Sequence, residues 1–147
     1  MRCIVQRVSS AAVYVEGKEV GSIDQGLLVF VGFGHKDDEA LLEPMINKLL
    51  KLRIFSDKDG RMKRNIIDIN GEILLVSQFT LYGSLKKGHR PSFTEACPPE
   101  RAQMLYDALI GKAESIYPGM IQSGIFGADM KVSLLNDGPV TLSLELV

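Results

Sequence analysis

A short aliphatic run that turns abruptly polar constrains this chain more than any other stretch. Ile73-Leu74-Leu75-Val76 has the composition of a buried strand, which we expect to extend over about residues 72–82. It ends in Ser77-Gln78-Phe79-Thr80-Leu81, where three hydrogen-bonding side chains arrive together. Either the strand reaches water there, or polar groups on a rigid element converge on a ligand. The pattern alone slightly favours the first interpretation.

Further strands and two helices are indicated on either side of this run. Apolar residues at helical spacing predict one helix with Asp37 or Asp38 as its N-cap and another that starts at Pro98-Pro99. Pro44 should kink the first helix or mark its beginning nearer Glu43. Strands are expected at residues 2–8, 11–16, 20–23, 27–33, 125–135 and 140–146. The whole chain, residues 1–147, is thus predicted to be a single α+β domain with mixed and antiparallel, barrel-like sheets and two main amphipathic helices.

Asn136-Asp137-Gly138-Pro139 is predicted to be the turn that joins the last two strands, because glycine tolerates the positive φ of tight turns. Proline is less expected there, since it removes a backbone donor next to a strand. Sequence alone gives the bond before it only the ordinary cis frequency of about 5–6%. The Gly138-Pro139 pair is therefore the oddest local feature of the chain.

The charge balance limits the class of partner. The chain has 17 Lys and Arg against 18 Asp and Glu, a net charge of −1, and its pI is about 6.1. No global positive field exists to draw in nucleic acid, so a DNA-binding protein is not expected, although a local basic patch is allowed. Two patches are as consistent with phosphate binding as with a solvated loop: Lys86, Lys87 and Arg90 in the loop 83–93, and Arg61, Lys63 and Arg64.

The chain shows no sign of a membrane-bound or secreted protein. No stretch approaches the ~20 apolar residues of a membrane span, and the first residues lack the apolar core of a signal peptide. Cys3 and Cys97 match no metal-binding spacing and are expected to be reduced thiols. We therefore expect a cytoplasmic protein with no membrane partner.

A conventional side-chain catalyst is hard to find in this sequence. The two histidines, His35 and His89, lack the neighbouring ligands of a metal site, so no metal is expected. No serine has a nucleophile-elbow context, and no base is evident for Thr80. No glycine-rich loop has the form that binds a nucleotide cofactor, so no cofactor is expected either.

Several separated motifs, in order along the chain, closely resemble the D-aminoacyl-tRNA deacylases. They are residues 4–8, 53–57, 77–81, 88–93, 126–130 and 136–141. The resemblance implies hydrolysis of the ester bond of D-aminoacyl-tRNAs, and of mischarged glycyl-tRNA, as chiral proofreading in translation. The Ser-Gln-Phe-Thr and Gly-Pro stretches are similar to those of the D-specific type, and differ from those of the related subfamily that edits L-alanine on threonine tRNA.

The resemblance also implies roles for individual residues. It implies a homodimer in which Gly138-Pro139, with its peptide bond cis, reaches into the partner's pocket and excludes L-amino acids. The catalytic pocket floor would comprise Ser77, Gln78, Phe79 and Thr80, and the terminal adenosine of the tRNA would lie against Phe126, Gly127, Ala128 and Met130. Arg7 would pack against the Gly-Pro turn. The low pI fits such a substrate, because a protein that holds mainly the acceptor end needs only a few phosphate contacts, such as Lys86, Lys87 and Arg90.

Catalysis without a catalytic side chain is chemically reasonable for this substrate. Aminoacyl esters are labile, so orientation and an oxyanion contact from main-chain N–H groups near Phe79 and Thr80 would suffice. The family resemblance implies that the ribose 2′-OH of the substrate helps to activate water. Two alternatives stay open: a non-catalytic RNA- or nucleotide-binding module that stacks bases on Phe79, Phe93 and Phe126, and a metal-dependent hydrolase that uses His35 or His89.

Overall fold

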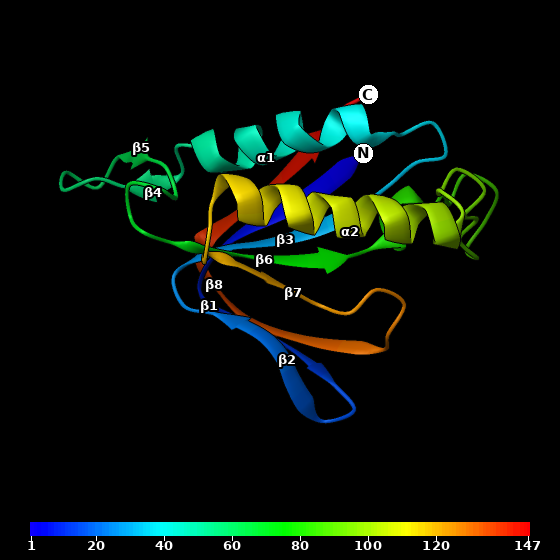
Figure 1. Cartoon of the computed structure of the whole chain (residues 1–147), viewed down its shortest axis with the longest axis horizontal. Helices are drawn as coiled ribbons and strands as arrows, with labels where there is room; N and C mark the ends of the chain where they lie inside the picture. Colours follow the sequence, from blue (N-terminus) through cyan, green and yellow to red (C-terminus); the bar gives the residue numbers. More distant parts are fainter.

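The computed structural model describes all residues from 1 to 147, in which eight strands and two α-helices form one body (Figure 1). Two short 3-10 helices, η1 and η2, complete it. In chain order the elements are β1 (Arg2–Val15), β2 (Lys18–Ile23), β3 (Gly26–Gly32), η1 (Glu39–Leu41), α1 (Leu42–Lys51), β4 (Phe55–Ser56), β5 (Met62–Arg64), β6 (Glu72–Ser77), η2 (Phe79–Tyr82), α2 (Pro99–Ile116), β7 (Ile121–Ser123) and β8 (Met130–Glu145).

The main sheet is mixed and curls into a nearly closed barrel, which confirms the predicted fold class. Its strand order is β2-β1-β3-β6-β7, with β8 also paired to β1. The β3–β6 and β6–β7 pairs are parallel, whereas β1 is antiparallel to β2, β3 and β8. β2 and β7 lie close together across the barrel, because a Cβ atom added at Gly21 of β2 would lie only 2.8 Å from the carbonyl oxygen of Ser123 on β7.

Two cores hold the layers together. Figure 1 shows α1 and α2 lying side by side over one face of the sheet. Their apolar faces and that face of the sheet form a cluster of 23 buried residues, which includes Leu49, Tyr106 and Leu109. A second cluster of seven residues fills the barrel: Val8, Ala11, Val13, Ile23, Leu28, Leu74 and Val76. Neither helix has the length and apolarity that a membrane-spanning segment needs.

The start of α1 resolves the ambiguity about its cap and its proline. Asp38 is an N-cap, but of η1, where its carboxylate accepts a hydrogen bond from the Ala40 N–H at 2.9 Å. The α-helix proper follows from Leu42, slightly earlier than the predicted start near Glu43. Pro44 lies in its first turn, where a missing N–H donor costs nothing.

Two long bent strands replace four predicted short ones. Residues 2–8 and 11–16 were expected to be separate, yet β1 runs unbroken from Arg2 to Val15. Likewise β8 is one strand that includes residues 130–135 and 140–145 of the two strands predicted there. Figure 1 shows β1 and β8 bending together at one end of the molecule. The register between them shifts at this bend, as β-bulges require. One half of each strand therefore lies under the helices and the other half belongs to the barrel wall.

Asn136-Asp137-Gly138-Pro139 is consequently not a turn between strands, as the sequence suggested, but part of this bend. Gln6 pairs with Thr141 and Val8 with Asn136, so four residues of β8 stand opposite Arg7 alone. The extra residues are displaced from the ladder, and the Gly138–Pro139 bond among them is cis. β8 continues as a strand after them because the pairs on both sides, Val8 with Asn136 and Gln6 with Thr141, are formed with β1.

The strand predicted over 72–82 ends early, at Ser77. The Gln78 N–H still bonds to the Val31 carbonyl oxygen at 2.7 Å, but the chain then turns into η2. On the other side of β6 the partner strand β7 has already ended at Ser123. The turn is held from far away in the sequence, because the Arg2 guanidinium donates to the Leu81 carbonyl at 3.0 Å and stacks 4.4 Å over the Tyr82 ring.

Candidate functional site

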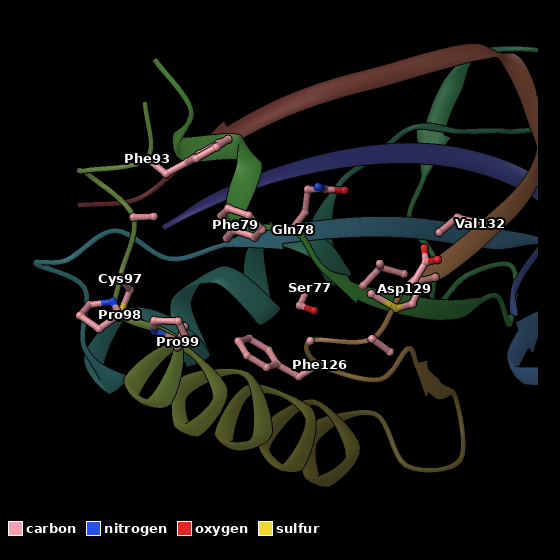
Figure 2. A pocket seen from close by; sticks show the side chains of 16 residues that line it. Ser77, Gln78, Phe79, Phe93, Cys97, Pro98, Pro99, Phe126, Asp129 and Val132 are labelled. Carbon is pink, nitrogen blue, oxygen red and sulfur yellow. The ribbon is translucent and has the colours of Figure 1, made fainter. Parts of the chain in front are cut away.

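A cavity of about 570 Å³ opens between the end of β6, the start of α2 and the segment that leads into β8. Figure 2 shows its lining side chains, which come from these three parts of the fold and from the loop before α2. Ten of its 16 lining residues are hydrophobic, as expected of a ligand pocket with a few polar groups. The lining residues are Val76, Ser77, Gln78, Phe79, Phe93, Ala96, Cys97, Pro98, Pro99, Ala102, Phe126, Gly127, Ala128, Asp129, Met130 and Val132.

The structure brings together most of the residues that the sequence pointed to. Ser77, Gln78 and Phe79 line the cavity at the end of β6, and the set formed by Phe126, Gly127, Ala128 and Met130 lines it from the opposite segment. Thr80 is exposed beside it and is not among the lining residues. Its hydroxyl oxygen accepts a hydrogen bond from the Gln78 side-chain amide, so the two side chains lie on the same side of the turn.

The backbone at this turn offers free donors. Phe79 and Thr80 are the first two residues of η2, and N–H groups at the start of a helix have no carbonyl partner within it. The Gln78 side chain forms no capping bond to them. The turn itself closes through later N–H groups, from Leu81 to the Gln78 carbonyl at 3.2 Å and from Gly83 to the Thr80 carbonyl at 3.0 Å. Two adjacent N–H groups at the pocket's edge are thus available to a substrate oxygen.

Aromatic contacts define the shape of the cavity. Phe79 is 56% exposed, and its ring meets that of Phe93 edge-on at a centroid distance of 5.0 Å. The centroid of the Phe126 ring lies 5.9 Å from that of the buried Tyr106 ring on α2. These rings give the pocket flat apolar walls that suit a nucleobase or an apolar side chain.

No side chain in the cavity is activated as a nucleophile. Burial raises the pKa of the Cys97 thiol, so the neutral form dominates around pH 7 and the thiolate needed for attack is scarce. Asp129, the one carboxylate in the lining, pairs with Lys131 at 3.1 Å. His35 and His89 lie outside the lining, and nowhere in the chain do three His, Cys, Asp or Glu side chains gather as metal ligands do.

Sequence reasoning missed part of the lining. Pro98 and Pro99 were recognised only as the start of a helix, and Ala96, Cys97, Ala102 and Val132 were given no role. Small apolar residues carry no chemical signature, and only the packing of α2 against β6 brings them to the site. The motif match over residues 126–130 was the available signal for Asp129.

Gly138, Pro139 and Arg7 do not line the cavity of their own chain. Figure 1 shows the bend of β8 at one side of the body and the yellow-green loop that precedes α2 at the opposite side. Arg7 Nε donates to the Asp137 carbonyl at 2.9 Å, and a Cβ atom on Gly138 would lie only 2.8 Å from Arg7 Nη2. The Asn136 side chain braces the other side by accepting from the Val140 N–H at 2.8 Å.

The basic loop 83–93 adjoins the cavity through Phe93, which is part of the lining. The predicted phosphate contacts Lys86, Lys87 and Arg90 are all exposed on it. None of the four ion pairs of the structure involves them. Their charges are therefore available to an anion outside the protein.

The chain is similar to known proteins over nearly its whole length. The family model of the D-Tyr-tRNA(Tyr) deacylase matches residues 4–145. The chain belongs to this deacylase family. Relatives that are named D-aminoacyl-tRNA deacylase include one from Ectopseudomonas mendocina, 51% identical over 99% of this chain and 100% of the relative, and one from Chloroherpeton thalassium, 52% identical over 99% and 95%.

Solved structures agree with the family in fold. One, described as a c-Myc DNA unwinding element binding protein, is 40% identical to this chain and superposes with a TM-score of 0.95. The match covers 100% of this chain and 99% of the other. A second, described as a probable eukaryotic D-amino acid tRNA deacylase, is 18% identical with a TM-score of 0.86 over 99% of this chain and 98% of the other. At that identity the second likeness concerns the deacylase fold alone.

Proposed function

We propose that this protein hydrolyses the ester bond between a D-amino acid and the terminal ribose of tRNA, and so releases free tRNA during translation quality control. Family membership and relatives about half identical over nearly the full chain support this reaction. The observation that carries it is a cavity with free main-chain donors at Phe79 and Thr80 and no nucleophile–base pair. A tRNA substrate also assigns the protein to the cytoplasm.

The mechanism rests on orientation and backbone electrostatics. The N–H groups of Phe79 and Thr80 hold the ester carbonyl and stabilise the negative charge that develops on its oxygen. The ribose 2′-OH beside the ester helps to activate the attacking water, which requires no base from the protein. The Thr80 hydroxyl, already engaged by Gln78, orients the turn rather than attacking. Ser77 and Gln78 form the floor that fixes the carbonyl.

The acceptor end of the tRNA enters against the opposite wall. Phe126 offers a ring face for the terminal adenine, and Gly127, Ala128 and Met130 shape the surface beside it. Gly127 has φ of +78° and no side chain, so that the backbone can lie close to the nucleoside. Lys86, Lys87 and Arg90 contact the phosphates that follow.

The working enzyme is a homodimer in which each subunit inserts Gly138-Pro139 into the partner's cavity. Three features support this arrangement: the segment lies outside its own cavity, is exposed, and is held in shape by Arg7 and Asn136. A fixed backbone placed beside the substrate Cα excludes a side chain on one side and accepts a hydrogen atom there. L-Amino acids are rejected by this clash, whereas D-amino acids of many kinds, and glycine, are accepted.

Release of tyrosine from D-tyrosyl-tRNA by the purified protein, in the presence of a chelator, tests the reaction. Fast release establishes the hydrolase and excludes the metal-dependent alternative. Loss of release in chelator, with recovery on adding a divalent metal, would instead favour a metal site at His35 or His89. No release with tRNA still bound would favour the non-catalytic RNA-binding module.

A further inference from the structure

The hairpin formed by β4 and β5 carries several positive charges that have no role in the function proposed above. We call residues 53–64 the basic hairpin. It has five cations against two carboxylates, a net charge of +3 in a chain whose net charge is −1. Figure 1 shows that β4 and β5 project from one end of the body, beyond the end of α1. Like charges gathered on a projecting element repel one another unless an anion lies between them.

The two carboxylates of the hairpin do not neutralise its cations. Asp57 accepts hydrogen bonds from the N–H groups of Asp59 and Arg61 at 2.8 and 2.9 Å, so that its charge stabilises the tight turn predicted here. Asp59 forms no ion pair. All four ion pairs of the structure involve other residues, and the five cations have no carboxylate partner.

Two arginines of the hairpin are held by the backbone in a way that leaves their outer donors free. Arg53 Nε donates to the Lys63 carbonyl at 3.0 Å, and Arg64 Nε donates to the Ser56 carbonyl at 2.9 Å. Both side chains are on exposed residues, and their Nη groups make no bond within the protein. A guanidinium fixed through Nε presents its remaining N–H groups as a fork, the geometry that matches a phosphate.

One side chain ties this hairpin to the segment proposed to enter the partner subunit. Arg7 Nη1 donates to the Ile54 carbonyl at the start of the hairpin at 2.6 Å, while Arg7 Nε donates to the Asp137 carbonyl at 2.9 Å. The Arg7 side chain is only 11% exposed, and its bond to the Ile54 carbonyl is partly buried. Wherever Gly138-Pro139 goes in the dimer, the basic hairpin must therefore lie beside it.

We propose that Arg53, Lys63 and Arg64 bind backbone phosphates of the tRNA whose acceptor end occupies the partner's cavity. The inference rests on the proposed function. The tRNA is then held from two sides, by Lys86, Lys87 and Arg90 of the subunit that cleaves it and by the basic hairpin of the subunit that supplies Gly138-Pro139. This arrangement explains how a chain with a net negative charge holds a polyanion.

The test combines tRNA binding with hydrolysis of two substrates by the double variant Arg53→Gln/Arg64→Gln. We expect affinity for uncharged tRNA to fall about tenfold near 0.1 M salt, and the slope of log K against log salt to shrink by about 0.7–0.9 per lost contact. The KM for D-tyrosyl-tRNA should rise by a similar factor. Arg53→Lys/Arg64→Lys should give an intermediate loss, and Lys18→Gln, at the exposed start of β2, should change neither quantity.

The D-tyrosyl ester of adenosine, which has no tRNA stem, is the second substrate. Its hydrolysis by the double variant should match that of the wild type, because the stem contacts are absent from both reactions. A parallel loss on the ester and on the tRNA would overturn the proposal, since it would show a distorted pocket, and so would an unchanged salt slope. If the wild type cleaves neither substrate, the proposed function fails, while the salt slope still judges the hairpin.

Mixed dimers test whether the hairpin acts on the partner's substrate. Ala128→Trp places an indole in the cavity and should abolish the activity of that subunit. A dimer that combines a wild-type subunit with one carrying Ala128→Trp and both hairpin changes should show the raised KM. Moving the hairpin changes to the subunit with the open cavity should restore the wild-type KM. The opposite pattern would show that the hairpin serves its own cavity and would contradict the proposal.

Discussion

The hydroxyl group of Tyr106 donates to the carbonyl oxygen of Leu75 at 2.8 Å, and this bond joins the two walls of the cavity. The same carbonyl accepts from the Gly124 N–H at 2.9 Å, two residues before Phe126. Leu75 precedes Ser77 by two residues on β6. The Tyr106 ring, 1% exposed, also packs against Phe126. One residue of α2 thus positions both the end of β6 and the wall that is proposed to bind adenosine.

Tyr106→Phe should lower kcat by roughly 3- to 30-fold with little change in KM, because loosening of both walls spoils alignment more than binding. Loss of this buried hydrogen bond should also cost about 1 kcal/mol of stability, since the Leu75 carbonyl then keeps only the Gly124 N–H as its donor. Tyr117→Phe is the matched control, since the Tyr117 hydroxyl donates to the Gly71 carbonyl at 2.7 Å, away from the cavity. Steady-state kinetics and thermal unfolding of both variants separate the two effects. Equal kinetics for both would show that Tyr106 is only structural.

Thr80→Ala should remain active, with kcat reduced by only about 2- to 10-fold. The Thr80 hydroxyl accepts one hydrogen bond from the Gln78 side chain, which is worth about 1 kcal/mol. The backbone N–H of residue 80 is unchanged by the substitution. Single-turnover hydrolysis at saturating enzyme measures this directly. Complete loss of hydrolysis in a variant that still binds tRNA would mean that the side chain performs chemistry and that the backbone mechanism is wrong.

Gly138→Ala should weaken discrimination against L-aminoacyl-tRNA by about tenfold or more. The residue has φ of +135°, and its added Cβ would stand 2.8 Å from Arg7 Nη2 and 2.9 Å from Val140 Cγ2, so the segment must shift. Gly88→Ala is a matched control with the same φ and open space around it. The ratio of kcat/KM for D- and L-tyrosyl-tRNA is the readout. An unchanged ratio in Gly138→Ala would remove this segment from the chiral selection.

Asp37→Asn should destabilise the fold by about 1–3 kcal/mol and reduce activity as η2 loosens. The carboxylate is 6% exposed, accepts from the Gly34 N–H at 2.6 Å and the Tyr82 hydroxyl at 3.3 Å, and lies 2.5 Å from the Met1 amino group. Asp38→Asn should have almost no effect, because asparagine caps helices as well as aspartate does. Urea unfolding of the two variants makes the comparison; equal stabilities would contradict it.

The sequence correctly predicted the elements whose burial follows from their own residues alone. The continuous apolar run of β3 and the helical spacing on α2 each specify burial without help from distant residues. The fold class followed from these elements.

The bends and ends of strands depend on partners far away in sequence, which explains the errors. Gly138-Pro139 interrupts β8 without ending it because Asn136 and Thr141 both still pair with β1. β6 ends at Ser77 because β7 is short and Arg2 holds Leu81 in the turn. The motifs predicted the cavity residues at 77–79 and 126–130, whereas Cys97 and Ala102 line the cavity only through helix packing.

Parallel hydrolysis of D-tyrosyl-, L-tyrosyl- and glycyl-tRNA by the wild-type protein tests the central claim, that chirality is selected by exclusion, most directly. Exclusion acts on the side of Cα where an L side chain would lie, and glycine has a hydrogen atom there. The account predicts fast release from the D-tyrosyl and glycyl esters and almost none from the L-tyrosyl ester. Release from the D-tyrosyl ester alone would show that the pocket recognises the D side chain itself, and would contradict selection by exclusion.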